Sequence, residues 1–430
     1  MNVFIKLLMC ACMALIYRGV SAQTDTLYLS TTQAEDIFIK QNLQLIAEKL
    51  NIDIADAAIM QAKLWPNPTL SIQDVNLWTT EQQRDGEQEI IPPLFGSFAR
   101  NTQFALGLEQ VILTGGKRRK LVEMEKVTRD IAVQYFEEVI RCLKVELRNT
   151  CAEILYLQEY RKVMDNQQTQ LEELIANIRN QAAQGNVSQR ELLRLQASLL
   201  EVRSEINELQ MDMNLLQKEL KLLLNNTALT YIILIVSDDN VKPPENLIFA
   251  QLIAQADVSR PDLKTTMYQK VFSEKSLRYE KSMRIPDLTF SATYDRAGGV
   301  TTNFVGFGVS MDLPFFDRNK GNIKAAQISL QQSQTLAELK QLEVHSEVVQ
   351  AVQNYILVYD FSRQITGDFI ANLDEMLESY TRNFVNKNIG IVEYLDFFEV
   401  YKENKRTMLS AQKNVKISFE ELQYAVGVEL

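Results

Sequence analysis

Apolar residues recur along most of the chain at the spacing of long helices. A first helical segment is predicted over residues 31–64, because Pro66 and Pro68 follow it and disfavour helix. A second runs from Lys117 to Gln184 without Pro or Gly, and at about 1.5 Å per residue it measures roughly 100 Å. No compact domain needs such a helix, so we expect it to lie along a coiled coil or a tube.

The next helix runs back after a polar turn, "QGNVS". In this turn Gly185 suits the C-cap of the first helix and Ser188 suits the N-cap of the second. A seam of apolar residues then follows 3-4 spacing, which predicts coiled-coil packing against a neighbouring helix. The seam consists of Leu192, Leu195, Leu199, Val202, Ile206, Leu209, Met213, Leu216, Leu220 and Leu223.

Four short segments instead alternate apolar residues with small or polar ones, the period of β-strands. They lie near residues 68–77, 102–113, 286–296 and 302–315. In the last, Val305, Phe307, Val309 and Met311 alternate with Gly306, Gly308, Ser310 and Asp312. This pattern fits a membrane β-barrel with lipid outside and water inside, and closure would require several chains that each give four strands. An edge hairpin on a soluble domain is the alternative.

The second half of the chain repeats the first at an offset of 202 residues. "VILTGGKRR" aligns with "LPFFDRNKG", "NVSQRELL" with "NIGIVEYL" and "KELKLLLN" with "EELQYAVG". Three pairs of aligned segments at one offset and in the same order indicate an internal duplication, with repeats over about 31–230 and 250–430. The fold class predicted is therefore mainly α with a membrane β-barrel, built from a duplicated helix-strand-strand-helix-helix repeat. The second seam is smaller and more polar, so we expect the second coil to pack less firmly and to move.

The N-terminus has the pattern of a secretory signal peptide over residues 1–22. A basic residue precedes an apolar core over residues 7–17, and a small-residue cleavage site precedes Gln23. Lipidation of Cys10 or Cys12 is the alternative. Cleavage there would leave a mature chain of residues 23–430.

Charge and cysteine content exclude several classes of protein. Residues 1–22 carry two basic residues and no acid, so their removal changes the formal charge from −10 to −12. Such an acidic chain does not suit nucleic-acid binding. Cys142 and Cys151 lie nine apart in a predicted helix, so a disulfide between them is unlikely, and we expect two small buried side chains.

One basic segment, "LEQVILTGGKRRKL", has the look of a phosphate loop. The G-x-x-x-x-G-K-[ST] pattern is not met, because the earlier glycine and the hydroxyl after Lys117 are missing. We interpret it as a joint where strand becomes helix, with Glu123 and Glu125 or acidic lipid as compensation for its cations. With one His and no HExxH, GxSxG or CxxC, we expect no catalytic residue, no cofactor and no metal site.

Together these features resemble the outer-membrane efflux protein family, the TolC-like ducts of Gram-negative bacteria. The matching segments are "NLQL" (42–45), "LWPNPTLSI" (64–72), "LEQVILTGGKRR" (108–119), "GNVSQRELLRLQ" (185–196), "RPDL" (260–263), "IPDLTFSATY" (285–294), "VSMDLPFFDRNKG" (309–321) and "NIGIVEYLDFFEVY" (388–401). "LWPNP" and "PFFDRNKG" are most similar to the heavy-metal branch.

The resemblance implies the architecture, partners and location of the protein. The expected assembly is a homotrimer with a 12-stranded barrel in outer-membrane lipid and an α-barrel tunnel that extends into the periplasm. Its expected partners are a periplasmic adaptor (membrane fusion) protein and an inner-membrane pump of the RND type. The expected function is a passive efflux duct for metal cations or drugs, gated at its periplasmic end.

Two sets of site residues follow. Glu393 and Asp396 lie three apart on one helix face, and at the matching positions the family has acidic residues that ring the closed aperture. Such a ring would favour cations, although acids also favour a helix N-terminus in general. The two turns are expected to contact the adaptor. Their residues are Gly185, Asn186, Val187, Ser188, Asn388, Ile389 and Gly390.

A second function remains open at this stage. A periplasmic adaptor or other coiled-coil interaction protein without a barrel would also need long helices. Adaptors usually have one hairpin with flanking β-domains, whereas this chain has two full repeats and four long strands. An enzyme is the least favoured class.

Overall fold

The computed structural model describes residues 26–76, 94–95, 102–183, 187–227, 230–236, 241–297 and 302–430. The predicted signal peptide and both lipidation candidates lie outside these residues. The described chain divides into two compact units. We call the described parts of Glu48–Glu138 and Pro261–Glu343 the strand unit, and those of Met1–Ala47, Val139–Arg260 and Val344–Leu430 the hairpin unit.

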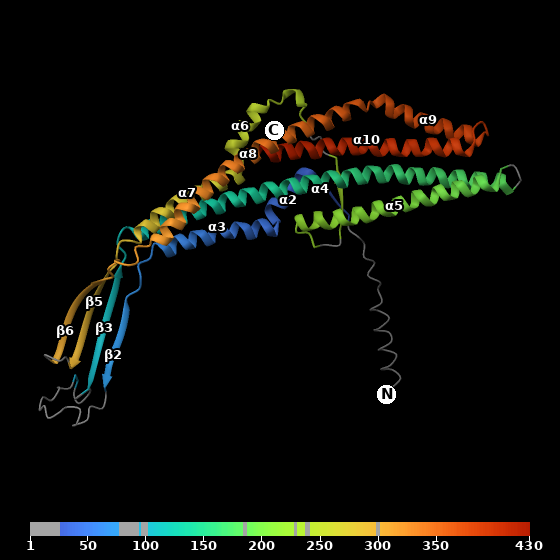
Figure 1. Ribbon diagram of the computed structural model, residues 1–430. Coiled ribbons are helices and arrows are strands. Elements are labelled where there is room, and N and C mark those ends of the chain that lie inside the picture. Colours follow the sequence, from blue (N-terminus) through green and yellow to red (C-terminus); the bar gives the residue numbers. More distant parts are fainter. Residues whose placement is uncertain are drawn as a thin grey trace, which may run out of the picture. The chain divides into compact units, whose positions relative to one another are not determined.

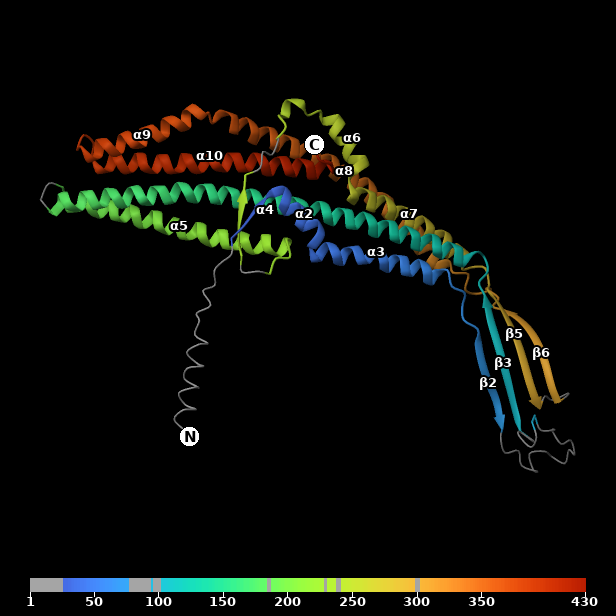
Figure 2. The ribbon, with the colours of Figure 1, turned by 180° about the vertical axis from the view of Figure 1, so that it is seen from behind.

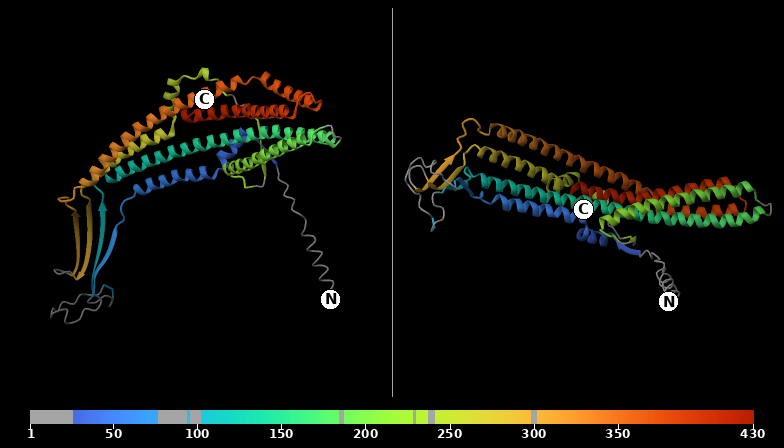
Figure 3. Two further views of the ribbon diagram at one scale, coloured as in Figure 1. Left: turned by 45° about the vertical axis from the view of Figure 1, so that its right-hand side comes forward. Right: turned by 90° about the horizontal axis from the view of Figure 1, so that it is seen from below.

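The strand unit contains one four-stranded antiparallel sheet in the order β2-β3-β5-β6 (Figure 1). Its strands are β2 (Thr69–Asn76), β3 (Gln103–Ile112), β5 (Leu288–Ala297) and β6 (Thr302–Met311). They stay side by side in every view (Figure 3). The prediction of four strands in one sheet is confirmed. β6 ends at Met311 rather than near 315, because Pro314 cannot donate to a strand ladder.

Helices α3 (Leu43–Ala62) and α7 (Pro261–Ser282) precede the two strand pairs. Helices α4 (Lys117–Ala183) and α8 (Lys320–Gln364) follow them, and each continues into the hairpin unit. The prediction of one uninterrupted helix from Lys117 is confirmed by the 67 residues of α4. In the second repeat the corresponding helix is divided, because α9 (Gly367–Val385) begins afresh at the N-cap Thr366.

The hairpin unit contains two antiparallel helix pairs (Figure 2). In one, α4 packs against α5 (Gln189–Leu223), and in the other α9 packs against α10 (Ile391–Val426). Most of the predicted α5 seam is buried. Leu199 and Leu216 are only half-buried, and their neighbours Ser198 and Gln217 are buried instead.

A small parallel sheet, β1 (Thr26–Ser30) with β4 (Tyr231–Ile235), was absent from the sequence prediction. Each strand has five residues, and "YIILI" lacks the alternation that marks a half-buried strand. Helices α2 (Thr31–Gln41) and α6 (Phe249–Ser259) and the short turn η2 (Pro244–Asn246) complete the unit.

The first predicted helix, 31–64, is two helices that meet at Asn42, so that prediction was wrong in its continuity. The buried Asn42 amide accepts a hydrogen bond from the Leu45 N–H and donates to the Leu223 carbonyl. In the second repeat Arg260 lies between α6 and α7 and donates to the Ala425 carbonyl. Leu223 and Ala425 are 202 residues apart. In both repeats, therefore, a side chain from the corresponding helix junction, α2–α3 or α6–α7, caps the end of the return helix.

Candidate functional site

The sheet of the strand unit is amphipathic. The strand register puts one set of apolar residues on a single face, because residues directly opposite each other share a face. They are Leu70, Ile72, Leu106, Leu108, Ile112, Leu288, Phe290, Ala292, Tyr294, Val305, Phe307, Val309 and Met311. Most of this face is open, and Phe307 is 86% exposed. A soluble domain would bury such a face.

The opposite face is mostly polar or small, with Phe304 and Val111 as large apolar residues. Its paired positions include Ser71, Gly107, Thr293, Gly306 and Gly308. A Cβ added to Gly107 would lie 2.6 Å from the Ser71 hydroxyl, and one added to Gly308 would lie 2.6 Å from that of Ser291. Glycine is therefore required at both positions, because the serine hydroxyl of the neighbouring strand occupies the space that a Cβ would need.

The basic segment after β3 forms a tight joint rather than a phosphate site. Lys117 is 5% exposed, and its ammonium is paired with Asp287 at 2.8 Å. The other Asp287 oxygen accepts the Thr114 N–H at 2.8 Å. Gly115 and Gly116 have φ of +61° and +68°, the left-handed region that glycine adopts readily. The first cation of α4 is thus neutralised by Asp287, a residue that the sequence analysis did not name.

Of the two acids proposed as compensation, one is engaged. Glu123 lies 4.0 Å from Arg119 and accepts a hydrogen bond from Lys275 at 2.9 Å. That hydrogen bond and the charge of Lys275 lower the pKa of Glu123. No ion pair of Glu125 occurs among the described residues.

The first tip is only partly described. Gly185 and Asn186 lie outside the described residues, whereas Val187 and Ser188 precede α5. The Ser188 side chain accepts from the Arg190 N–H, and the Glu191 carboxylate accepts from the Ser188 N–H at 3.1 Å. The predicted N-cap is present as a capping box, so Glu191 is committed to its own helix.

The second tip is described in full. Lys387 has φ of +63°, and the Asn388 N–H donates to the Asn383 carbonyl at 2.9 Å. Asn388 and Gly390 are exposed, and Ile389 is half-buried. Gly390 is the N-cap of α10 and has no side chain with which to cap.

Glu393 and Asp396 lie in the first turns of α10, and both are exposed. Among the described residues neither carboxylate has a hydrogen bond or an ion pair. Glu393 is the repeat counterpart of Glu191, yet the cap that engages Glu191 is missing here. The second tip therefore presents two uncommitted acids where the first presents a closed capping box.

The α9–α10 pair is packed with aromatic rings. The rings of Tyr380 and Phe397 stack at 4.3 Å and those of Phe384 and Tyr394 at 5.1 Å. Tyr394 and Phe397 are the counterparts of the seam residues Leu192 and Leu195 at an offset of 202. The expectation that it packs less firmly than the α4–α5 pair stays a prediction.

An ion pair joins α9 to α10 beside these rings. The Lys405 ammonium, in a side chain only 10% exposed, lies 2.7 Å from Asp374, and the Tyr401 hydroxyl donates to Asp374 at 2.8 Å. The counterparts at an offset of 202 are Glu172 and Arg203, which pair at 2.8 Å between α4 and α5. The sequence analysis missed both pairs, although matched charges at the repeat offset could have revealed them.

A second charge cluster lies between α2, α4 and α10. Arg148 bonds Glu35 at 2.5 Å, Glu420 at 2.8 Å and Glu429 at 3.0 Å. Burial raises the pKa of Glu420, and the bond from Arg148 only partly offsets this. Burial alone would lower the pKa of Arg148, but its bonds to Glu35 and Glu420 outweigh burial and keep that pKa raised. The cluster clamps three elements together.

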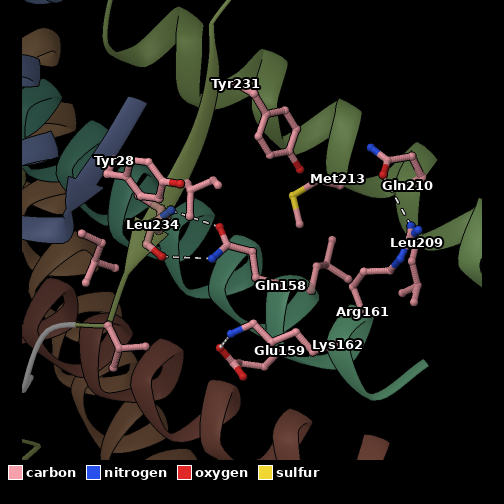
Figure 4. A pocket seen from close by; sticks show the side chains of 14 residues that line it. Tyr28, Gln158, Glu159, Arg161, Lys162, Leu209, Gln210, Met213, Tyr231 and Leu234 are labelled. Carbon is pink, nitrogen blue, oxygen red and sulfur yellow. Dashed lines mark hydrogen bonds and ion pairs between the residues drawn. The ribbon is translucent and has the colours of Figure 1, made fainter. Parts of the chain in front are cut away.

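Figure 4 shows a pocket of about 500 Å³ between α4, α5 and β4. Gln158 both donates to and accepts from the Leu234 backbone at 3.0 Å (Figure 4). Gln217 does the same for Ile232 at 2.6 and 3.0 Å. Two glutamine side chains thus complete the ladder of β4 on the side away from β1. The polar groups of this pocket serve the fold and need no ligand.

The two cysteines among the described residues, Cys142 and Cys151, form no disulfide. Cys151 is buried as expected, whereas Cys142 is exposed, which corrects the expectation of two buried side chains. Cys142 lies on the face of α4 turned away from the buried Leu143 and Leu147. Within the described ranges no group of three or more His, Cys, Asp or Glu could hold a metal ion. No helix in the part of the chain that the structure describes is long and apolar enough to cross a bilayer.

Solved structures of outer-membrane channels share this fold. The structure described as CusC, in work on folding and transmembrane channel formation, has a TM-score of 0.74 and 16% identity, over 96% of this chain and 95% of that one. The CmeC outer membrane channel of Campylobacter jejuni has a TM-score of 0.74 and 14% identity, over 92% and 85%. The outer membrane protein VceC of Vibrio cholerae has a TM-score of 0.70 and 14% identity, over 93% and 96%. None of the curated proteins matches.

Residues 36–226, most of the first repeat, match the family model described as Outer membrane efflux protein. This part of the chain is similar to the outer membrane efflux protein family. The resemblance inferred from the sequence is confirmed, and so is the fold class, a mainly helical chain with the strands of an outer-membrane channel. This family and the similar structures are channels.

Proposed function

We propose that the chain is the outer-membrane channel of a tripartite efflux system, a passive duct from the periplasm to the exterior. One observation carries the proposal: a four-stranded sheet with an exposed apolar face and with both edge strands, β2 and β6, unpaired within the described residues. Such a sheet requires lipid on one face and neighbouring strands at its edges.

Three copies would satisfy both requirements. β2 begins at the joint end of the sheet and β6 ends there, so β6 of one copy and β2 of the next would run antiparallel. Closure would thus continue the pairing found within the chain and give twelve strands. The polar faces would line the lumen. Their charged residues at paired positions are Glu109 and Asp295, which suits cationic cargo such as metal ions and supports the heavy-metal branch over a drug exporter.

The helix pairs would form the periplasmic tunnel, with the two tips toward a periplasmic adaptor and an inner-membrane pump of the RND type. The energy for export would come from that pump. The signal peptide, 1–22, would direct the chain to the periplasm and outer membrane.

Membrane fractionation and planar-bilayer recordings of the full chain test the proposal. A heat-modifiable trimer in the outer membrane and stepwise single-channel conductance are expected. Cysteines at Ile72 on β2 and at Val305, Phe307 or Val309 on β6 should also cross-link neighbouring copies in one register, in a background without Cys142 and Cys151. A periplasmic protein without conductance would instead identify an adaptor or other coiled-coil protein.

We further propose that Glu393 and Asp396 form the aperture ring, six carboxylates in the trimer. Neither carboxylate has a hydrogen bond or an ion pair with another described residue, which supports this role, because a capping role would engage Glu393 as it does Glu191. Glu393→Ala with Asp396→Ala should raise single-channel conductance and weaken block by divalent cations. Glu191→Ala is the control, and it should leave conductance as it is. Unchanged conductance in the double variant would remove the gating role.

A further inference from the structure

A band of apolar and basic side chains surrounds the joint end of the sheet, where β2 and β5 begin and β3 and β6 end. We call it the joint collar and define it as residues 63–66, 113–120, 281–287 and 312–320. Its large apolar side chains are open to solvent, and Phe316 is completely exposed. The others are Leu64, Trp65, Met283, Ile285, Leu313 and Phe315.

The collar is strongly basic in an otherwise acidic chain. Its four segments contain nine Lys or Arg residues and three Asp residues. Lys117 is buried against Asp287 and the exposed Arg119 lies 4.0 Å from Glu123, but five other exposed cations have no carboxylate partner among the described residues. These are Lys63, Lys281, Arg284, Arg318 and Lys320. A solvated basic surface would not need the exposed aromatic rings beside it.

Arg118 is a collar cation that the fold holds against an aromatic ring. Its guanidinium lies 4.0 Å from the centre of the Trp65 ring and donates to the Lys63 carbonyl at 2.9 Å. The remaining guanidinium donors have no partner in the described part of the chain. A pocket of about 220 Å³, lined in part by Trp65, Arg118, Tyr279 and Met283, adjoins it.

Phosphodiester headgroups would suit the exposed aromatic rings, the exposed cations and the fixed guanidinium of the collar. A fixed guanidinium binds phosphate oxygens through paired N–H donors, and exposed Lys and Arg add attraction to anionic lipid. Tryptophan and other aromatic rings favour the boundary between hydrocarbon and water. The apolar face of the sheet ends at this collar, so in the proposed barrel the lipid headgroups would lie at the same level.

We propose that the joint collar binds the phospholipid headgroups of the periplasmic leaflet, with Arg118, held against Trp65, as the fixed headgroup contact. The proposal rests on the membrane orientation under the proposed function. Lipid is favoured over a protein partner because the collar is continuous with the exposed apolar face, and over free phosphate because its cations alternate with apolar side chains.

Trp65 itself can report on the proposal. The chain has two tryptophans, so Trp78→Phe leaves Trp65 as the only one. The full chain would be reconstituted in phosphatidylcholine vesicles that contain lipids brominated near the headgroup or deep in the acyl chain. Shallow bromines should quench Trp65 more than deep ones. Brominated phosphatidylglycerol should quench it at a lower mole fraction than brominated phosphatidylcholine.

The Arg118→Gln variant should lose about fivefold of the preference for phosphatidylglycerol. Lys63→Gln should lose a similar factor, and it serves as the second variant because Lys63 is exposed and its substitution does not endanger folding. Arg179→Gln is the matched control, an exposed arginine of the same helix outside the collar, and it should keep the preference. An unchanged preference in both collar variants would overturn the proposal, as would loss of the preference on addition of inorganic phosphate.

A second reporter separates this inference from the channel function. Phe307→Trp, in a chain with Trp65→Phe and Trp78→Phe, places the only tryptophan on the apolar face. Quenching of this probe by deep bromines, with no quenching of Trp65 by shallow ones, would be consistent with the proposed channel function. It would overturn the lipid proposal and indicate that protein covers the collar. No quenching of either probe, with no conductance, would count against the proposed function itself.

Discussion

Asp374 gives the sharpest test of how the second helix pair is held. Asp374→Ala removes the only carboxylate that pairs with Lys405 among the described residues, and it also removes the acceptor of the Tyr401 hydroxyl. Lys405 would then be an ammonium in a side chain 10% exposed, without a counter-charge.

The expected cost lies between two limits. Loss of one partner from a fully buried pair costs about 3–5 kcal/mol, and loss of an exposed pair about 0–1 kcal/mol. Lys405 is buried but Asp374 is half exposed, so water screens part of the interaction. We expect about 2 kcal/mol, which corresponds to roughly 30-fold in a local opening equilibrium.

Hydrogen exchange measured by mass spectrometry on the full chain would detect this change. Amides of α9 and α10 near Asp374 and Tyr401 should exchange about 30-fold faster in Asp374→Ala. The repeat provides a matched control, because Glu172→Ala breaks the equivalent pair with Arg203, whose side chain is 53% exposed. Its effect should be small, because water screens the exposed pair.

A double variant isolates the pair. Lys405→Met removes the buried charge, so Asp374→Ala should cost much less in that background, with a coupling energy of about 1–2 kcal/mol. Equal effects of Asp374→Ala in both backgrounds, or equal effects of Asp374→Ala and Glu172→Ala, would refute the reasoning.

In the wild type, slower exchange in α9–α10 than in α4–α5 would contradict the expectation that the second coil is the looser one.

Three further predictions concern the membrane face, the core polar groups and the response to alkali. Phe307→Arg puts a charge on the proposed lipid face and should cost about 2–4 kcal/mol of barrel stability, measured as loss of heat-modifiable trimer, whereas Ser310→Arg on the opposite face should insert normally. Gln217→Leu removes both hydrogen bonds to Ile232 and should cost about 2–4 kcal/mol in thermal unfolding, while Gln210→Leu on the exposed side of α5 should change it little. Burial and the hydrogen bond to Glu205 raise the pKa of Tyr160, and burial and Asp374 raise that of Tyr401. Unfolded tyrosine ionises near pH 10, so this stability is complete below about pH 10 and is lost as the pH rises above it. Tyrosinate absorbance should appear together with loss of helix, and ionisation of all tyrosines without loss of helix would contradict the assignment.

Much of the fold follows from local pattern. The alternation around Val305 and Phe307 predicted both the strand and its apolar face, and the Pro- and Gly-free run after Lys117 predicted α4. The capping box of Ser188 and Glu191 depends on residues three apart, and the duplication gave the order of elements twice. In each case the determining contacts lie within a few residues, or the repeat supplies a second copy of the signal.

The site was predicted less completely than the fold. The positions of Glu393 and Asp396 came from the family resemblance, and the structure adds that neither is engaged by the fold. The pairs that hold the elements together, such as Lys405 with Asp374 and Lys117 with Asp287, were not foreseen. The exposed aromatic rings of the collar became a feature only when four distant segments met at one end of the sheet.

The sequence by itself therefore determined most of the helices, the four long strands, their faces and their repetition, because periodicity and capping are local properties of the chain. Only the tertiary structure decided which charged side chains are paired with an opposite charge and which remain exposed to solvent. Lys117 and Asp287 are 170 residues apart, and Arg148 and Glu420 are 272 apart, so no local pattern links them. The same holds for β1 and β4, whose five-residue pairing is completed on the other side of β4 by Gln158 and Gln217, residues distant from β1 in the sequence.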